Sequence, residues 1–262
     1  MDEQLFFLIN SNHTAFWDSM MYCISQKTVW IPFYLSVIYV ILRNYSWKVL
    51  AVVLLMIGCG MLITDWGNAH LLRPWIGRLR PSNPENPISS MVHIVNDRRG
   101  AGCGFPSAHS ANIWLLTFVI CYWLRNRLIM ITMPLVALLV CYSRVYLGFH
   151  YPGDILGGFV LAAIVAWAAI RLQQRYGHRI YAPANKPYAS DGKLYASVSE
   201  SYASDGKLYA SVSESYASAE REKNGSEKGP FNIPRKENFR ECIIVPIVIV
   251  MTLIVFCFVS IS

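Results

Sequence analysis

Residues 143–154 read SRVYLGFHYPGD and lie between two apolar runs, 128–142 and 155–170. Charged side chains in such a short stretch are costly in a bilayer unless water or a partner reaches them. Each flanking run is nearly long enough to cross the hydrocarbon core as a helix, which takes about 20 apolar residues. The stretch therefore predicts a polar loop at a membrane edge that joins two spanning helices.

Apolar blocks of this kind dominate the chain. Hydrophobic residues make up 54% of its 262 residues and charged residues only 15%, whereas soluble domains carry about 25% charged residues. Further apolar runs occupy 29–42, 48–64, 107–124 and 243–261. The composition excludes an ordinary soluble domain and predicts an all-α integral membrane protein, a helical bundle with about five core transmembrane helices within residues 29–171.

The segments that flank this core differ from it and from each other. Within residues 1–28, the stretch 4–25 alternates apolar and polar positions with a loosely helical period. We expect an interfacial helix lying on the membrane, and a short extra span is the alternative. Residues 242–262 are expected to form a further transmembrane helix, which either packs on the bundle or only anchors the tail.

Between the core and this last helix, residues 172–241 are rich in Ser, Ala, Lys, Glu and Gly. The sequence YASDGKLYASVSES occurs there twice, at 188–201 and 202–215. A repeat with so few apolar residues cannot bury a core of its own, so we expect a flexible linker. The alternative is an interaction or modification segment with Tyr and Ser targets.

Positively charged residues predict the orientation of the bundle. The loops and segments at one side of the predicted spans hold Arg43, Lys48, Arg125, Arg127, Arg171, Arg175 and Arg179. Short loops rich in Lys and Arg face the cytoplasm, which places loops 65–107 and 143–154 on the outer side. These outer loops contain further arginines, of which Arg78, Arg98 and Arg99 are interpreted as solvated or as contacts to lipid headgroups.

Three stretches at the outer face carry residues suited to phosphate chemistry: RPWIGRLRP at 73–81, PSAH at 106–109, and the opening stretch. Guanidinium groups match phosphate oxygens in a bidentate manner. Ser107 follows a proline and opens an apolar run, so it is a natural N-cap. The amides of Ala108 and His109 would then be free donors at a helix N-terminus, where anions bind.

Two histidines could supply the reactive groups. One imidazole can attack phosphorus while the other donates and accepts a proton. Asp154 follows His150 by four residues, and a helix that starts at Pro152 would bring its carboxylate close to the imidazole. A carboxylate on one ring nitrogen fixes the tautomer and leaves the other nitrogen free to attack.

In order and spacing, the three stretches resemble the type-2 phosphatidic acid phosphatase (lipid phosphate phosphatase) superfamily, whose pattern is K-x6-RP, PSGH and SR-x5-H-x3-D. The resemblance covers roughly residues 29–171 and points to a bacterial membrane member. The chain departs from the pattern at Arg73, where the family usually has Lys, and at Ala108, where Gly is commoner.

The resemblance implies a role for each matching residue. His150 would be the nucleophile, Asp154 would orient it, and His109 would transfer protons. The phosphoryl oxygens would be held by Arg73, Arg80, Ser107, the amide of Ala108, and Arg144. No cofactor and no metal is implied, and the Cys and His residues are not spaced like a zinc site.

The function implied is hydrolysis of a lipid phosphate or diphosphate at the bilayer edge through a phosphohistidine. Lipid A phosphate, undecaprenyl diphosphate, phosphatidylglycerol phosphate and phosphatidic acid are the possible substrates, and the additional outer arginines favour the first two. A lipid phosphotransferase and a non-catalytic lipid-binding protein are the alternatives. We expect the bacterial inner membrane as location, a periplasmic active site, a lipid in the bilayer as partner, and no nucleic acid.

Overall fold

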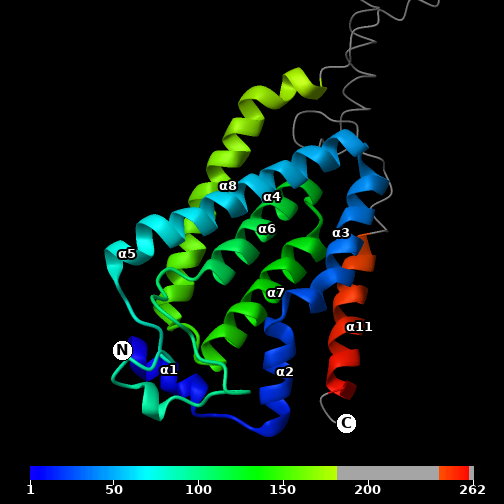
Figure 1. Cartoon of the computed structure of the whole chain (residues 1–262). Coiled ribbons are helices and arrows are strands. Elements are labelled where there is room, and N and C mark those ends of the chain that lie inside the picture. Colours follow the sequence, from blue (N-terminus) through cyan, green and yellow to red (C-terminus); the bar gives the residue numbers. More distant parts are fainter. Residues whose placement is uncertain (182–241, 260–262) are drawn as a thin grey trace, which may run out of the picture. The chain divides into compact units, whose positions relative to one another are not determined.

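The computed structural model describes residues 1–181 and 242–259, and in these ranges the regular elements are helices (Figure 1). The long helices in the core are α3 (Ile31–Asn44), α4 (Trp47–Gly67), α6 (Ala108–Leu124), α7 (Arg127–Tyr146) and α8 (Pro152–Tyr181). Residues 1–171 and the described part of the tail, 242–259, belong to one compact unit. The predicted all-α fold class is confirmed.

Length and composition identify the helices able to cross a membrane. Trp47–Ile76, Arg127–Tyr146 and Pro152–Tyr176 qualify by themselves within the described ranges. A fourth span results if α2 (Ala15–Ser25) and the following helical segment Lys27–Asn44, which meet at a bend of 68°, are counted together. α6 is apolar but has only 17 residues.

The centre of the bundle is formed by α6, which packs against α4 and α7 (Figure 1). Gly60 permits the close approach of α4, because a Cβ atom at this position would lie 2.6 Å from Cδ2 of Leu115. Small residues serve this purpose between membrane helices, where packing contacts stabilise association. At the C-terminal end of α6, the Tyr45 hydroxyl donates to the Trp123 carbonyl at 2.7 Å. These contacts fix the position of α6, whose first turn contains Ala108 and His109 of the predicted phosphate site.

The N-terminal segment differs from the single helix predicted over 4–25. It forms two helices, α1 (Asp2–Asn10) and α2, with a break at residues 11–14. Thr14 caps α2 by accepting from the Trp17 amide at 3.3 Å, and the Asn10 side chain bonds to backbone groups of loop 77–107 and α7. The segment is helical as the sequence predicts, but polar side chains at the break stabilise a turn that divides it into two helices. Its position on the membrane stays a prediction.

Residues 65–76 are helical, whereas the sequence predicts that a loop begins at residue 65. α4 continues through a π-helical segment, η2 (Asn68–Leu72), into α5 (Arg73–Ile76). Gly77 ends the helix with φ +65°, and its amide donates to the Arg73 carbonyl at 2.9 Å, a C-terminal arrangement for which glycine is favoured. Arg73 consequently projects from the end of a helix rather than from a loop.

Two predictions concern the part of the chain after the core. α8 continues to Tyr181, so the first residues of the predicted linker are helical, and the repeats at 188–201 and 202–215 lie outside the described residues. The final helix, α11 (Ile244–Val259), contacts α3, α7 and α2, and buries Val245 and Ile249. Of the two alternatives for this helix, packing on the bundle is the one observed. The division into four segments at 28, 171 and 241 stays a prediction.

Candidate active site

The site lies where one end of the bundle meets loop 77–107. α5 ends at this face, α6 and α8 begin there, and α7 ends there. The loop folds back on itself, since the Gly104 amide donates to the Arg78 carbonyl at 2.8 Å and the Arg80 amide donates to the Gly102 carbonyl at 3.3 Å. These bonds bring the first two polar stretches of the sequence beside each other.

His150 and Asp154 form a buried pair at the start of α8. Pro152 begins the helix as predicted, and Nδ1 of His150 lies 3.4 Å from Oδ2 of Asp154. The same carboxylate oxygen accepts from the Tyr151 amide at 3.0 Å, and Oδ1 accepts from Arg78 at 3.1 Å. His150 is 1% exposed and Asp154 is fully buried. The pair favours the imidazole tautomer with its proton on Nδ1, so Nε2 keeps a free lone pair.

Gly104 packs directly over this pair. A Cβ atom at position 104 would lie 2.9 Å from Oδ2 of Asp154, 3.5 Å from Nδ1 of His150 and 3.1 Å from Cγ of Arg80. Heavy atoms other than hydrogen-bond partners do not approach as closely as the first of these distances. Glycine is therefore required here for the backbone to cover the histidine and the aspartate.

Ser107 joins the start of α6 to the start of α8. Its Oγ caps α6 by accepting from the Ser110 amide at 3.4 Å, as the sequence predicts, and its own amide donates to the Asp154 carbonyl at 2.9 Å. The first amides of a helix have no partner within the helix. Ala108 and His109 occupy the first two positions of α6, so their N–H groups are donors available to an anion.

Three arginines without carboxylate partners converge on His150. Arg73, Arg80 and Arg144 are all within electrostatic range of its imidazole, and each has a buried Nε atom without a hydrogen-bond partner. Among the described residues no ion pair involves any of them. Arg144 donates to the Ser25 hydroxyl, and its guanidinium lies 4.1 Å from the centroid of the Phe149 ring. Buried cations with free donors are the arrangement expected of an anion-binding site.

Burial and the neighbouring arginines shift the pKa values of His150 and Arg80. Burial, followed by the charges of Arg80, Arg144 and Arg73, holds the pKa of His150 well below its usual value of 6.5. Burial and the neighbouring Arg73 also lower the pKa of Arg80 from its usual value. His150 is therefore a neutral imidazole in a positive field, which is the form able to attack an electrophile.

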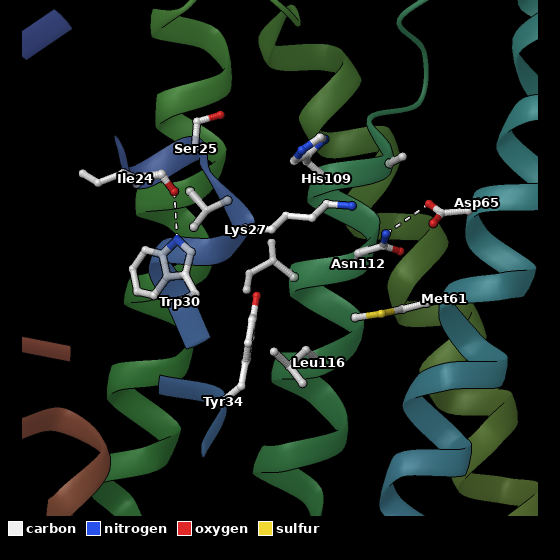
Figure 2. A pocket seen from close by; sticks show the side chains of 13 residues that line it. Ile24, Ser25, Lys27, Trp30, Tyr34, Met61, Asp65, His109, Asn112 and Leu116 are labelled. Atoms are coloured by element: carbon white, nitrogen blue, oxygen red, sulfur yellow. Dashed lines mark hydrogen bonds between the residues drawn. The ribbon is translucent and has the colours of Figure 1, made fainter. Parts of the chain in front are cut away.

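His109 lies at the boundary between two cavities, within electrostatic range of His150, Arg144 and Arg80. One cavity, of about 290 Å³, is mainly apolar and extends between α2, α3, α4 and α6 (Figure 2). The other, of about 670 Å³, has both polar and apolar walls. Its charged lining residues are mainly basic, namely Lys27, Arg98, Arg99 and Arg144, with Asp97 as the acidic one, and His109 also borders it. The residue thus faces an apolar compartment on one side and a basic one on the other.

Sequence reasoning missed several residues at this site. Arg78 is not merely solvated, because its guanidinium bridges Asp154 and Asp2 at 3.1 and 2.5 Å and lies over the Tyr151 ring. Lys27 extends from the start of η1 (Lys27–Trp30), the short helix before α3, into the apolar cavity, toward His109 and Asn112 (Figure 2). The spacing of Arg78 between Arg73 and Arg80 gave a weak signal, whereas nothing local in the sequence indicated Lys27 or Asp2.

Known proteins resemble this chain across the same region. A profile of the PAP2 superfamily matches residues 46–177, which include the three stretches that form the site. A lipid A 4'-phosphatase of Bacteroides thetaiotaomicron is 44% identical over 168 residues, or 64% of this chain and 74% of that protein. A lipid A 4'-phosphatase of Porphyromonas gingivalis is 28% identical over 165 residues, or 63% of this chain and 70% of that protein. The crystal structure of a PAP2-type phosphatidylglycerolphosphate phosphatase from Bacillus subtilis has a TM-score of 0.49 at 25% identity, and the match covers 66% of this chain and 85% of that one.

Proposed function

The chain belongs to the PAP2 superfamily and is an integral membrane lipid phosphatase, and we propose that it hydrolyses a phosphate monoester on a lipid A-type glycolipid through a phosphohistidine on His150. One observation carries this proposal. A neutral, buried imidazole oriented by Asp154 lies among three guanidinium groups that have free donors and, within the described part of the chain, no carboxylate partner. Such an arrangement suits nucleophilic attack on a bound phosphoryl group.

In the proposed first step, Nε2 of His150 attacks phosphorus, forming a nitrogen–phosphorus bond while the bond from phosphorus to the lipid oxygen breaks. His109 donates a proton to the leaving oxygen. In the second step His109 accepts a proton from water, the resulting hydroxide attacks the phosphohistidine, and inorganic phosphate is released. Asp154 holds the imidazole and stabilises the positive charge that develops on it.

The phosphoryl oxygens are assigned to the donors at the end of the bundle. Arg73, Arg80 and Arg144 would bind them through guanidinium groups, and Ser107 and the Ala108 amide would bind them from the start of α6. Fixed donors of this kind stabilise the charge that grows on the equatorial oxygens in the transition state. Arg73 in place of the usual lysine provides a planar group with more donors at the same position.

The two cavities beside His109 support the choice of substrate. The apolar cavity, lined by residues such as Trp30, Met61 and Leu116, suits part of an acyl chain. The basic cavity with Lys27, Arg98 and Arg99 suits a headgroup with negative charge in addition to the phosphate that is cleaved. A lipid A with two phosphates has both properties, and two relatives are named as lipid A 4'-phosphatases.

The location of the protein is proposed from the loops. The proposed location is the inner membrane with the site at its periplasmic face. Basic residues at the ends of the helices opposite the site support it: Arg43, Lys48, Arg125 and Arg127. A lipid substrate would reach His109 from the bilayer, and no nucleic acid is involved.

The test is phosphate release by the purified protein from four lipids: lipid A with two phosphates, undecaprenyl diphosphate, phosphatidylglycerol phosphate and phosphatidic acid. We expect the highest kcat/KM with lipid A, with release of free phosphate. Release only in the presence of an acceptor lipid, with phosphate appearing on that lipid, would instead identify a phosphotransferase. A higher kcat/KM for one of the other lipids would contradict the proposed substrate.

The basic cavity and the intermediate can be tested separately. Replacing Arg98 and Arg99 by Gln should reduce kcat/KM for lipid A with two phosphates more than for its singly phosphorylated form. Rapid quenching with radiolabelled substrate should trap an acid-labile, base-stable phosphoprotein that is missing in His150→Ala. Equal losses on both lipids would contradict recognition of a second anionic group, and a label retained in His150→Ala would contradict the assigned nucleophile.

A further inference from the structure

His13, Asp18 and His93 meet away from the catalytic residues. They lie in a region, here called the outer cap, formed by the connection between α1 and α2, the first turn of α2 and loop 77–107. One ligand-type atom from each lies within 4.8 Å of the others. Nε2 of His93 lies 3.1 and 3.0 Å from the two carboxylate oxygens of Asp18. The imidazoles of His13 and His93 are stacked in parallel with their centroids 3.6 Å apart. The described part of the chain contains no other group of three such residues.

Surrounding hydrogen bonds hold the side chain of Asp18 and the backbone of His93 in place. The Tyr146 hydroxyl donates to Oδ1 of Asp18 at 2.7 Å. Asn10, which is 1% exposed, accepts from the His93 amide at 2.8 Å and donates to the carbonyls of His93 and Tyr146 at 3.1 and 2.8 Å. Metal ligands are commonly fixed by a further shell of hydrogen bonds of this kind.

From this geometry we propose that His13, Asp18 and His93 bind one zinc ion. Two imidazoles and a carboxylate match the preference of Zn²⁺ for nitrogen and oxygen ligands, and three protein ligands leave a fourth position for water. Two imidazoles do not suit Mg²⁺ or Ca²⁺, which prefer oxygen ligands. Ligand atoms around a tetrahedral Zn²⁺ lie roughly 3.4 Å apart, given bond lengths of about 2.0–2.1 Å. Because the ligand atoms now lie within 4.8 Å of one another, the cluster needs to contract by up to about 1.4 Å.

That contraction is within reach of the side chains. His13 is exposed in the connection between α1 and α2, so its ring can turn away from the parallel stack and direct a nitrogen lone pair at the ion. Zinc binds a deprotonated carboxylate and neutral imidazoles, so its affinity should fall as the pH falls.

The ion would fasten three segments that are far apart in the sequence: the connection between α1 and α2, the first turn of α2, and loop 77–107. The site is separate from the proposed catalytic residues, and its role would be structural. The same loop carries Arg98 and Arg99, and Tyr146 lies two residues after Arg144 on α7. Zinc would therefore stabilise the outer cap that borders the basic cavity.

Calorimetric titration of the full-length protein tests this proposal. The protein is purified in detergent with a tag that contains no histidine, is treated with EDTA, and is then titrated with ZnCl₂. We expect one ion per chain, bound with micromolar or tighter affinity, and an increase in the melting temperature. His13→Ala should lower the affinity at least about tenfold, and Tyr146→Phe, which removes the donor to Asp18, should lower it by about 10- to 100-fold. Co²⁺ should give the visible absorption of a tetrahedral site.

His70→Ala is the matched control, because His70 is also exposed but stacks on Trp66 outside the cluster. It should bind zinc as the unaltered protein does. Absence of stoichiometric binding by the unaltered protein, or equal affinity in His13→Ala, would overturn the proposal. Phosphate release should persist in EDTA at a temperature well below the melting point, so loss of the zinc site and failure of the proposed reaction are distinguishable.

Discussion

Replacing Gly104 by alanine tests the orientation of the proposed nucleophile without removing any catalytic group. The added Cβ would lie 2.9 Å from Oδ2 of Asp154, whereas ordinary contacts begin near 3.4 Å. The carboxylate must therefore retreat by about 0.5 Å, and its bond to Nδ1 of His150, already 3.4 Å long, would be lost. Misplacement of a reacting group by about 1 Å can cost about 10²-fold in rate.

We therefore expect Gly104→Ala to lower kcat by about 10²-fold, which is about 2.7 kcal/mol of transition-state stabilisation. KM should change less, because the guanidinium groups that would bind phosphate keep their backbone positions. The assay measures the initial rate of phosphate release in detergent. The melting temperature and the yield of protein that stays soluble in detergent are the measures of folding. Loss of the orientation of the His150 imidazole should also reduce the initial burst of phosphohistidine relative to that of the unaltered protein.

Gly58→Ala is the matched control for this change, because a Cβ at position 58 on α4 meets nothing within 4 Å. It should retain full activity, and its effect on stability should be small or favourable, since Ala is preferred to Gly in helices. If Gly104→Ala folded normally and lost less than about fivefold in kcat, about 1 kcal/mol, the close contact with Asp154 would not control catalysis and the orienting role of the aspartate would be refuted.

Three further changes have defined outcomes. His150→Ala should abolish phosphate release while the protein stays folded in the membrane, and activity within about tenfold of the original would contradict its assignment as nucleophile. Burial holds the pKa of His150 in the folded protein well below 6.5. As the pH falls through 6.5, His150 therefore gains a proton only in the unfolded chain, which stabilises the unfolded state. The melting temperature should drop between pH 7 and pH 5, and the drop should be smaller in His150→Asn. Equal drops in both proteins would show that His150 contributes nothing to this pH dependence. Deleting one copy of the repeat, residues 202–215, should leave kcat and KM unchanged, because the sequence predicts a flexible linker there and the length of such a linker affects closure entropy only weakly. Reduced activity at normal expression would make the tail part of the working enzyme.

Local features of the sequence were sufficient for most of the bundle and for much of the proposed site. Long apolar runs locate helices because an uncharged run of that length can satisfy its backbone inside a bilayer only as a helix. The contact of His150 with Asp154 follows from a spacing of four residues on a helix that starts at a proline. The cap at Ser107 likewise depends only on its immediate neighbours. The family resemblance then gave these residues their expected chemistry, and the family itself is confirmed.

Other features depend on pairings between distant segments, and these could be decided only by the tertiary structure. The helical stretch that begins with α4 continues through η2 and α5 to residue 76, although Asp65, Asn68 and His70 are typical of a loop. The N-terminal helix breaks because Asn10 bonds to His93 and Tyr146, 83 and 136 residues away.

The network around the proposed nucleophile shows the same division. Its His150–Asp154 contact is local, but Asp154 also accepts from Arg78, 76 residues away, and Arg78 in turn pairs with Asp2. The cluster of His13, Asp18 and His93 is likewise assembled from distant segments, since Asp18 and His93 are 75 residues apart. Spacing along a chain determines which side chains meet within one helix, because the helix fixes their geometry. Which loops and termini meet at the end of a bundle is determined by packing between helices, and no short stretch of the sequence contains that information.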